Sequence, residues 1–167
     1  MRFDGVDDFV QLPNAAALNL MTFTIVIWLE FDSSRPEDDW IISKGSLYGN
    51  FSILRTGASA QYWAGYASYA HVTQGGNWSS VASSDPLPIG QFFCLAISLD
   101  ANNFRSYLNG RLTQSAANVS PPQLNDSPVY IGAGGYNDVN AFFRGVIDEV
   151  QIYGRVLSDS EVAQQCR

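Results

Sequence analysis

The sequence predicts an all-β protein, with two antiparallel sheets packed as a jelly roll sandwich and a short helix at the C-terminal end. Short runs of alternating apolar and polar residues recur at roughly 12-residue spacing, and turn residues separate them. Helical periodicity is confined to the C-terminal end. The chain has 167 residues and is 46% hydrophobic, which is enough for one packed core. We therefore expect a single domain over residues 1–167.

The predicted strands are rich in branched and aromatic residues and are bounded by Gly, Pro, Asn or Asp. They are residues 8–12, 23–31, 41–43, 51–54, 61–66, 92–99, 104–108, 111–113, 129–132 and 145–153. The run from Phe23 to Phe31 is apolar almost throughout and predicts a central strand. Asn109-Gly110 predicts a tight hairpin between two of the strands.

Other segments predict helix or loop. Ser158 and Glu161 have the spacing of a capping box, which predicts a helix from about Asp159 to Gln165. Residues 14–18 predict a helical turn. The stretch from 67 to 85 is long, small and polar, so we expect a functional loop there.

The charge of the chain limits its partners. The net charge is −7, and Lys44 is the only lysine. Because the chain has no basic stripe, it is not expected to bind nucleic acid or anionic lipid. Neutral ligands and cations are compatible with its charge. No window approaches the ~18 apolar residues that a membrane span needs. The chain opens directly as folded sequence at Met1, so we expect no signal peptide in it.

The two cysteines admit two interpretations. Cys94 lies in the apolar segment 92–96, which predicts a buried thiol that packs as a small hydrophobe. A disulfide between Cys94 and Cys166 is the alternative. Two cysteines and the single His71 are too few and too far apart for an ordinary structural zinc site.

Several segments together resemble the laminin-G-like, concanavalin A-like jelly roll domains. They follow the order of that family over nearly the whole chain. The segments are residues 3–10, 23–28, 42–45, 90–96, 107–110, 130–132, 143–153 and 155–158. The resemblance implies a concanavalin A-like sandwich and favours an extracellular or cell-surface protein. It says little about the ligand, because these residues belong mostly to the scaffold.

The resemblance also implies a structural calcium ion. In related jelly rolls such an ion ties the first turn to the last strand. By this resemblance Asp148 is the first side-chain ligand, followed by Asp4 and Asp7, with the carbonyl of Gly5 as a further donor. Asp8 completes the N-terminal acidic group. The alternative is that these acids only shape turns through hydrogen bonds to the backbone.

Aromatic residues in loop-like segments suggest a binding platform. Sugar rings present apolar C–H faces that stack on aromatic rings, and their hydroxyls bind amide, carboxylate and guanidinium groups. The aromatic candidates are Trp63, Tyr66, Tyr69, Trp78 and Tyr136, and the polar candidates are Arg55, His71 and Asn77. Trp28 and Phe23, by contrast, are expected in the core.

Catalysis is disfavoured. Retaining glycosidases of the resembling fold carry Glu-x-Asp-x-x-Glu, but Glu30-Phe31-Asp32 supplies only the first half and Arg35 stands at the last position. Asp148 and Glu149 are adjacent, so in a regular strand they would point to opposite faces and could not share one site.

The sequence therefore predicts a non-catalytic module that binds an oligo- or polysaccharide, with a structural calcium. An adhesion or protein-recognition module is the alternative, because the same aromatic patch would serve a protein partner. A glycoside hydrolase is the third hypothesis, and this activity would need two carboxylates in one cleft. The glycan and the oligomeric state are not determined by the sequence.

Overall fold

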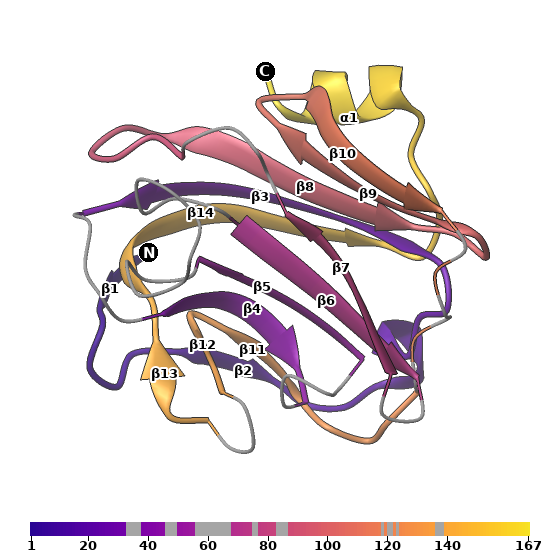
Figure 1. Cartoon of the computed structure of the whole chain (residues 1–167). Helices are drawn as coiled ribbons and strands as arrows, with labels where there is room; N and C mark the ends of the chain where they lie inside the picture. The colour runs from indigo at the N-terminus through magenta and orange to yellow at the C-terminus, as the bar shows by residue number, and fades with distance from the viewer. Residues whose placement is uncertain are drawn as a thin grey trace.

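The computed structural model describes residues 1–32, 38–45, 50–55, 68–74, 77–82, 87–117, 119, 122, 124–135 and 139–167. Within these ranges only the backbone is described for residues 68–74, 77–80 and 82. Most of this part of the chain forms antiparallel strands in two layers (Figure 1). The predicted all-β sandwich with a C-terminal helix is confirmed.

The two layers are sheets of six described strands each. In the first sheet the order is β1 (Arg2–Asp4), β14 (Arg144–Tyr153), β3 (Phe23–Phe31), β8 (Phe93–Leu99), β9 (Asn103–Leu108) and β10 (Arg111–Ala117). In the second it is β2 (Val10–Leu12), β11 (Val129–Ile131), β4 (Asp39–Lys44), β5 (Phe51–Arg55), β6 (Ser68–Gln74) and β7 (Asn77–Ala82). A small pair joins β12 (Ala133–Gly134) and β13 (Ala141–Phe142), and a 3₁₀ turn, η1 (Ala16–Leu18), follows β2.

The central strands β3 and β8 are buried on both faces. Ile25, Ile27 and Leu29 point into the main core between the sheets, whereas Val26 and Trp28 point outward. This alternation follows from the two-residue period of a strand. A strand covered on both sides must be apolar throughout, which explains the nearly continuous apolar run that marks β3.

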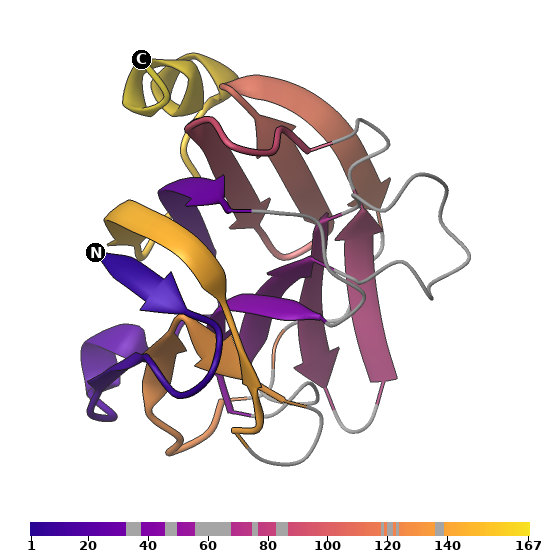
Figure 2. The ribbon, with the colours of Figure 1, turned by 90° about the vertical axis from the view of Figure 1, so that its left-hand side faces the viewer.

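The C-terminal helix α1 (Asp159–Gln165) covers part of the outer face of the first sheet. Figure 2 shows it on the side of that sheet away from the second sheet. A second apolar cluster lies beneath the helix and consists of Val26, Cys94, Ala96, Tyr107, Leu157, Val162 and Cys166. The helix is thus part of the packed structure, because it buries the outer side chains of β3 and β8.

Cys94 and Cys166 form a disulfide that joins β8 to the end of α1. The sequence favoured a free buried thiol at Cys94, and this interpretation was wrong. Cys94 is buried as expected, but it points to the outer face of β8, where α1 brings Cys166 beside it. The docking of α1 determines which cysteines pair, and no local sequence pattern predicts this disulfide.

Further contacts fix α1 at its two ends. Tyr107 donates a hydrogen bond from its hydroxyl to Asp159 Oδ1 (2.9 Å), and Trp28 donates from Nε1 to the carbonyl of Gln165 (3.1 Å). Gly110 lies against the helix, since a Cβ at this position would come within 2.8 Å of the Cα of Ala163. Gly110 also has a φ of 75° and Asn109 a φ of 49°, as the predicted hairpin turn requires.

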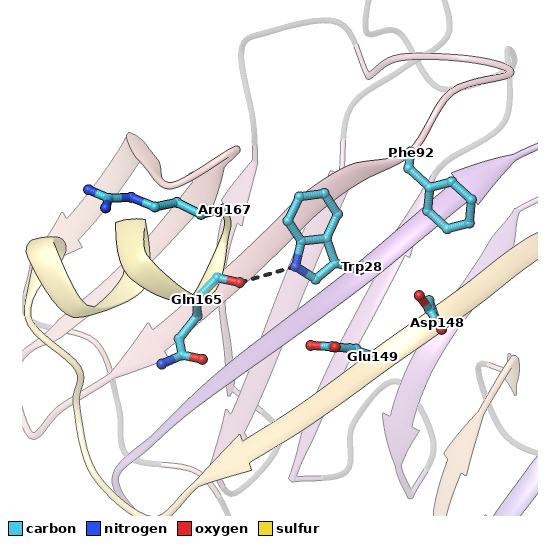
Figure 3. A pocket seen from close by; sticks show the side chains of 6 residues that line it. All are labelled: Trp28, Phe92, Asp148, Glu149, Gln165 and Arg167. Carbon is cyan, nitrogen blue, oxygen red and sulfur yellow. Dashed lines mark hydrogen bonds between the residues drawn. The ribbon is translucent and has the colours of Figure 1, made fainter.

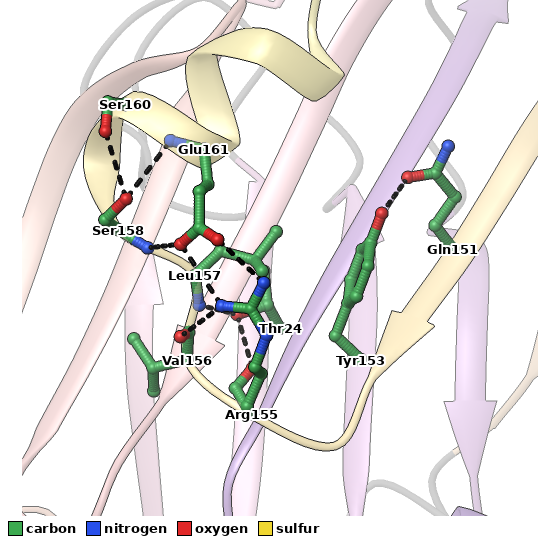
Figure 4. A network of polar contacts seen from close by, with 9 residues as sticks. All are labelled: Thr24, Gln151, Tyr153, Arg155, Val156, Leu157, Ser158, Ser160 and Glu161. Atoms are coloured by element: carbon green, nitrogen blue, oxygen red, sulfur yellow. Dashed lines mark hydrogen bonds and ion pairs between the residues drawn. The ribbon is translucent and has the colours of Figure 1, made fainter.

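The capping box at the start of α1 is present as predicted (Figure 4). Glu161 Oε2 accepts from the backbone N–H of Ser158 (2.8 Å), and Ser158 Oγ accepts from the backbone N–H of Glu161 (3.2 Å). Arg155 donates two hydrogen bonds to the same carboxylate (2.7 and 3.2 Å). The hydrogen bonds from Arg155, and then those from Ser158, lower the pKa of Glu161 from 4.5 to about 2.

We expect Glu161 to titrate with a midpoint near pH 2 in the folded protein. Because its pKa is lower in the folded state, the ionised carboxylate stabilises the fold. This contribution is complete above about pH 4.5 and is lost as the pH falls towards 2. An NMR titration of the carboxyl carbon measures the midpoint directly. Glu161→Gln is the control, since it should remove this component of the acid dependence. A midpoint close to 4.5 would contradict the prediction.

The second sheet contains a hairpin that the sequence did not predict. The stretch 67–85 was expected to be a loop, but residues 68–74 and 77–82 form β6 and β7. Their backbones pair with β5 and with each other, and such pairing outweighs the weak strand propensity of small polar residues. The predicted strand at 61–66 lies outside the described residues.

Among the described residues, no helix has the length and apolar character to cross a membrane.

Candidate functional site

Four of the predicted ligand-binding residues lie on two neighbouring strands. Tyr69 and His71 belong to β6, and Asn77 and Trp78 belong to β7. Three further candidates, Trp63, Tyr66 and Tyr136, lie outside the described residues. The structure thus brings part of the predicted set together through a hairpin that the sequence did not predict.

The register of this hairpin aligns three of the four positions. Tyr69 pairs with Leu54 and Ala82, His71 with Ser52 and Ser80, and Trp78 with Thr73. Val81, which pairs with Ala70, is buried in the main core. By the strand alternation, the positions of Tyr69, His71 and Trp78 therefore belong to the opposite face, away from the core. We call these three positions the β6–β7 band. Asn77 stands at the first residue of β7, where it pairs with Gln74.

Arg55 does not belong with this set, and the prediction for it was wrong. Its side chain is 1% exposed and donates a hydrogen bond to the buried carboxylate of Asp39. Its guanidinium also lies 4.5 Å from the centre of the Phe31 ring. The side chain contacts Asp39 of β4 and the ring of Phe31 in β3, and so it points towards the interior of the sandwich. Arg55 is therefore part of the buried interior and is not available to a ligand on the surface.

The predicted calcium ligands do not all meet. The carboxylates of Asp4, Asp7 and Asp8 each offer an oxygen within 4.8 Å of the others, and all three residues are exposed. Two of these carboxylates also bind the local backbone: Asp4 Oδ1 accepts from the N–H of Val6 (2.8 Å), and Asp8 Oδ2 accepts from the N–H of Asp4 (3.0 Å). Oxygen donors suit a hard cation such as calcium. The turn-shaping alternative is thus also present in the structure.

Asp148 lies away from this acidic group. In the pairing of β1 with β14, Asp4 stands opposite Arg144, and Arg2 stands opposite Val146. Asp148 is therefore four residues further along β14 from the partner of Asp4, or roughly 13 Å of extended strand. The expectation that Asp148 shares one ion with Asp4 and Asp7 is not met, because the register of β1 directs them to different places.

Asp148 instead lines a pocket on the outer face of the first sheet (Figure 3). The cavity has a volume of about 300 Å³. Its lining residues come from β3, from β14, from the segment before β8 and from the end of α1. They are Trp28, Phe92, Asp148, Glu149, Gln165 and Arg167. We call it the α1 pocket.

A β-bulge brings both acidic residues of this pocket to one face. Ile147 pairs with Leu29, and Val150 pairs with Ile27, so Asp148 and Glu149 together stand opposite Trp28. The sequence predicted that Asp148 and Glu149 point to opposite faces, and this was wrong. A bulge adds one residue to one strand and breaks the alternation. Two adjacent acids inside an apolar strand are the one sequence signal that could have indicated it.

Trp28 was also assigned wrongly. It was expected in the core, but it lies half-buried on the outer face of β3. The apolar run of β3 does not reveal which face is covered by the second sheet and which by a helix. Phe92 is 48% exposed at the rim of the same pocket.

The fold described above is that of a concanavalin A-like sandwich. The chain belongs to the concanavalin A-like lectin/glucanases superfamily, because a family model of the laminin G type with this description matches residues 4–163. The resemblance noted in the sequence is thereby confirmed. A search of curated protein sequences finds no significant match.

Solved structures share the fold at low sequence identity. A heptameric SAP-like pentraxin from Limulus polyphemus has a TM-score of 0.72 at 12% identity, over 99% of this chain and 80% of its own. Domain 4 of AbnA, a GH43 extracellular arabinanase from Geobacillus stearothermophilus, was solved with arabinotriose. It has a TM-score of 0.72 at 21% identity, over 95% and 72%. The binding domain of botulinum neurotoxin DC, solved with rat synaptotagmin II, has a TM-score of 0.69 at 13% identity, over 98% and 41%.

Proposed function

We propose that this chain is a non-catalytic carbohydrate-binding module. The observation that carries the proposal is the register of the β6–β7 band, which aligns Tyr69, His71 and Trp78 on the face of the second sheet away from the core. The aromatic residues Trp63 and Tyr66 belong to the segment that leads into β6, and so extend the same aromatic group along the chain.

The chemistry of these residues suits a neutral sugar. Aromatic rings offer flat apolar faces for the C–H groups of a pyranose or furanose, and they lose little conformational entropy on binding. His71 and Asn77 would bind hydroxyl groups, because both carry hydrogen-bond donors and acceptors. Tyr136 is a further proposed contact, whereas Arg55 is not. The net charge of −7 is compatible with an uncharged ligand.

The comparisons support a binding role for this scaffold. The related domain 4 of AbnA was solved in complex with arabinotriose, and it shares the fold of this chain. Protein recognition is the second candidate, since the neurotoxin binding domain with the same fold was solved with a protein, synaptotagmin II. We favour carbohydrate because Tyr69 of β6 and Trp78 of β7 combine with the polar His71 and Asn77, which suits a ligand with both C–H faces and hydroxyl groups.

We further propose that Asp4, Asp7 and Asp8 can hold a calcium ion, with the carbonyl of Gly5 as an additional donor. The proximity of the three carboxylates supports this assignment. Calcium prefers six to eight oxygen ligands, so water would complete the shell. Such an ion would hold the turn after β1 rigid, and it would do so without Asp148.

The test is calorimetric titration of the protein against a panel of neutral oligosaccharides, with calcium and with a chelator. We expect binding to at least one glycan and a weakening of about 10- to 100-fold for Trp78→Ala, since the burial of a large apolar side chain is lost. Leu112→Ala is the control, because Leu112 is an exposed apolar residue of β10 in the first sheet.

The outcomes separate the candidate functions. A panel without any binding, in either condition, would count against carbohydrate as the ligand. Equal affinity for Trp78→Ala and the parent protein would remove the β6–β7 band as the site. New reducing ends in the mixture would contradict the non-catalytic assignment, and identical titrations with calcium and chelator would contradict a role for the ion.

A further inference from the structure

The α1 pocket lies outside the β6–β7 band and on the other side of the sandwich. The outer face of the first sheet forms its floor, and the C-terminal end of α1 forms one wall. Its volume of about 300 Å³ is at the lower limit for pockets that bind small molecules. None of the residues proposed to bind carbohydrate or calcium on the other parts of the molecule contributes to it.

The pocket carries two carboxylates, and no cation of the described residues forms an ion pair with either of them. Asp148 and Glu149 are both exposed. Glu149 Oε2 accepts a hydrogen bond from the neutral amide of Gln151 (3.2 Å). Figure 3 shows the guanidinium of Arg167 on the far side of Trp28, directed away from both acids.

The aromatic side of the pocket is held in place. Trp28 donates its indole N–H to the carbonyl of Gln165, so this donor is already used and the ring orientation is fixed. Gln165 in turn precedes Cys166, whose disulfide to Cys94 anchors the end of α1 to β8. Phe92 adds a second ring, which is 48% exposed.

These groups together favour one kind of ligand. Two adjacent carboxylates repel anions and attract a positive charge. Aromatic rings attract an organic cation through their negative faces and also bury its carbon atoms. A metal ion would gain nothing from the two rings. A neutral sugar would gain no charge attraction from the two carboxylates.

We propose that the α1 pocket binds a small organic ammonium group, with Asp148 and Glu149 as the counter-charges and Trp28 and Phe92 as the aromatic walls. A quaternary ammonium headgroup and the protonated amine of an amino sugar share this chemistry. The bulge in β14 is the feature that creates the site, because it places both acids opposite Trp28. The inference does not depend on the carbohydrate-binding proposal.

The test follows the indole N–H signal of Trp28 by NMR during titration with choline. The matched probe is 3,3-dimethyl-1-butanol, which has the same shape without the charge. We expect choline to shift the signal and to bind at least tenfold more tightly than the alcohol. Glucosamine and glucose form a second matched pair. A response to glucosamine but not glucose identifies an amino sugar as a ligand, and a response to choline alone identifies the quaternary group.

Single substitutions complete the test. Asp148→Asn and Glu149→Gln should each weaken choline binding by about fivefold or more, with retained thermal stability. Asp32→Asn is the charge-matched control, because Asp32 directly follows β3 and pairs with Arg2 outside the pocket. Phe92→Ala should weaken choline binding without unfolding, since this ring is half-exposed. The proposal is overturned if choline gives no shift, if choline and the alcohol bind equally, or if the pocket variants bind like Asp32→Asn.

Discussion

Replacing Arg55 by Leu is expected to lower the free energy of unfolding by about 3–5 kcal/mol. The guanidinium is 1% exposed and binds Asp39, which is itself fully buried. Without Arg55, the charge of Asp39 would remain in the interior without the guanidinium, although Asp39 Oδ1 would still accept a hydrogen bond from the backbone N–H of Arg144 (3.1 Å). The contact of the guanidinium with the Phe31 ring would also be lost. Urea unfolding followed by fluorescence measures the change.

The pair of Arg2 and Asp32 provides the matched control. These side chains form an ion pair of 2.7 Å, but 66% of the Arg2 side chain is exposed. Arg2→Leu should therefore cost no more than about 1 kcal/mol. The double variant Arg55→Leu/Asp39→Asn should recover part of the loss, because the buried charge disappears with its partner. If Arg55→Leu cost no more than Arg2→Leu, the buried pair would not stabilise this fold.

Loss of the disulfide between Cys94 and Cys166 is expected to have an effect of similar size. The bond closes a loop with a sequence separation of 72 residues. Loops of this length restrict the unfolded chain strongly, and their disulfides contribute about 2–5 kcal/mol. For a domain of this size the melting temperature should fall by roughly 10 °C. Thermal unfolding of Cys94→Ala/Cys166→Ala measures this loss against the oxidised parent protein.

The disulfide prediction has an internal control. A reducing agent should lower the melting temperature of the parent protein and leave that of the double alanine variant unchanged. The Trp28 indole signal should also shift in the variant, since the end of α1 loses its anchor beside Gln165. Equal stability of the oxidised and reduced parent protein would show that packing of α1 alone holds the helix in place.

The local elements were predictable because their signals lie close together in the chain. The capping box of α1 needs only Ser158 and Glu161, and the β9–β10 hairpin needs only Asn109 and Gly110. The strand β3 was evident from its apolar run. The hairpin β6–β7 was missed, since its small polar residues owe their strand conformation to pairing with β5.

The candidate sites were predicted less well than the fold. The sequence grouped Tyr69, His71 and Trp78, and the register aligns these positions. It also joined Asp148 to Asp4 through the family resemblance, and it separated Asp148 from Glu149 on the assumption of a regular strand. One bulge in β14 reversed the second of these inferences, because a single extra residue changes the face of every residue that follows.

The sequence by itself determined the sandwich class, the central position of β3 and the start of α1, since each of these depends on side chains within a few positions of one another. Only the tertiary structure decided that Arg55 is buried against Asp39, that Cys94 pairs with Cys166, and that the α1 pocket exists. These features join residues from distant segments, and their geometry depends on strand register and on the docking of a helix. Both are properties of the packed chain as a whole.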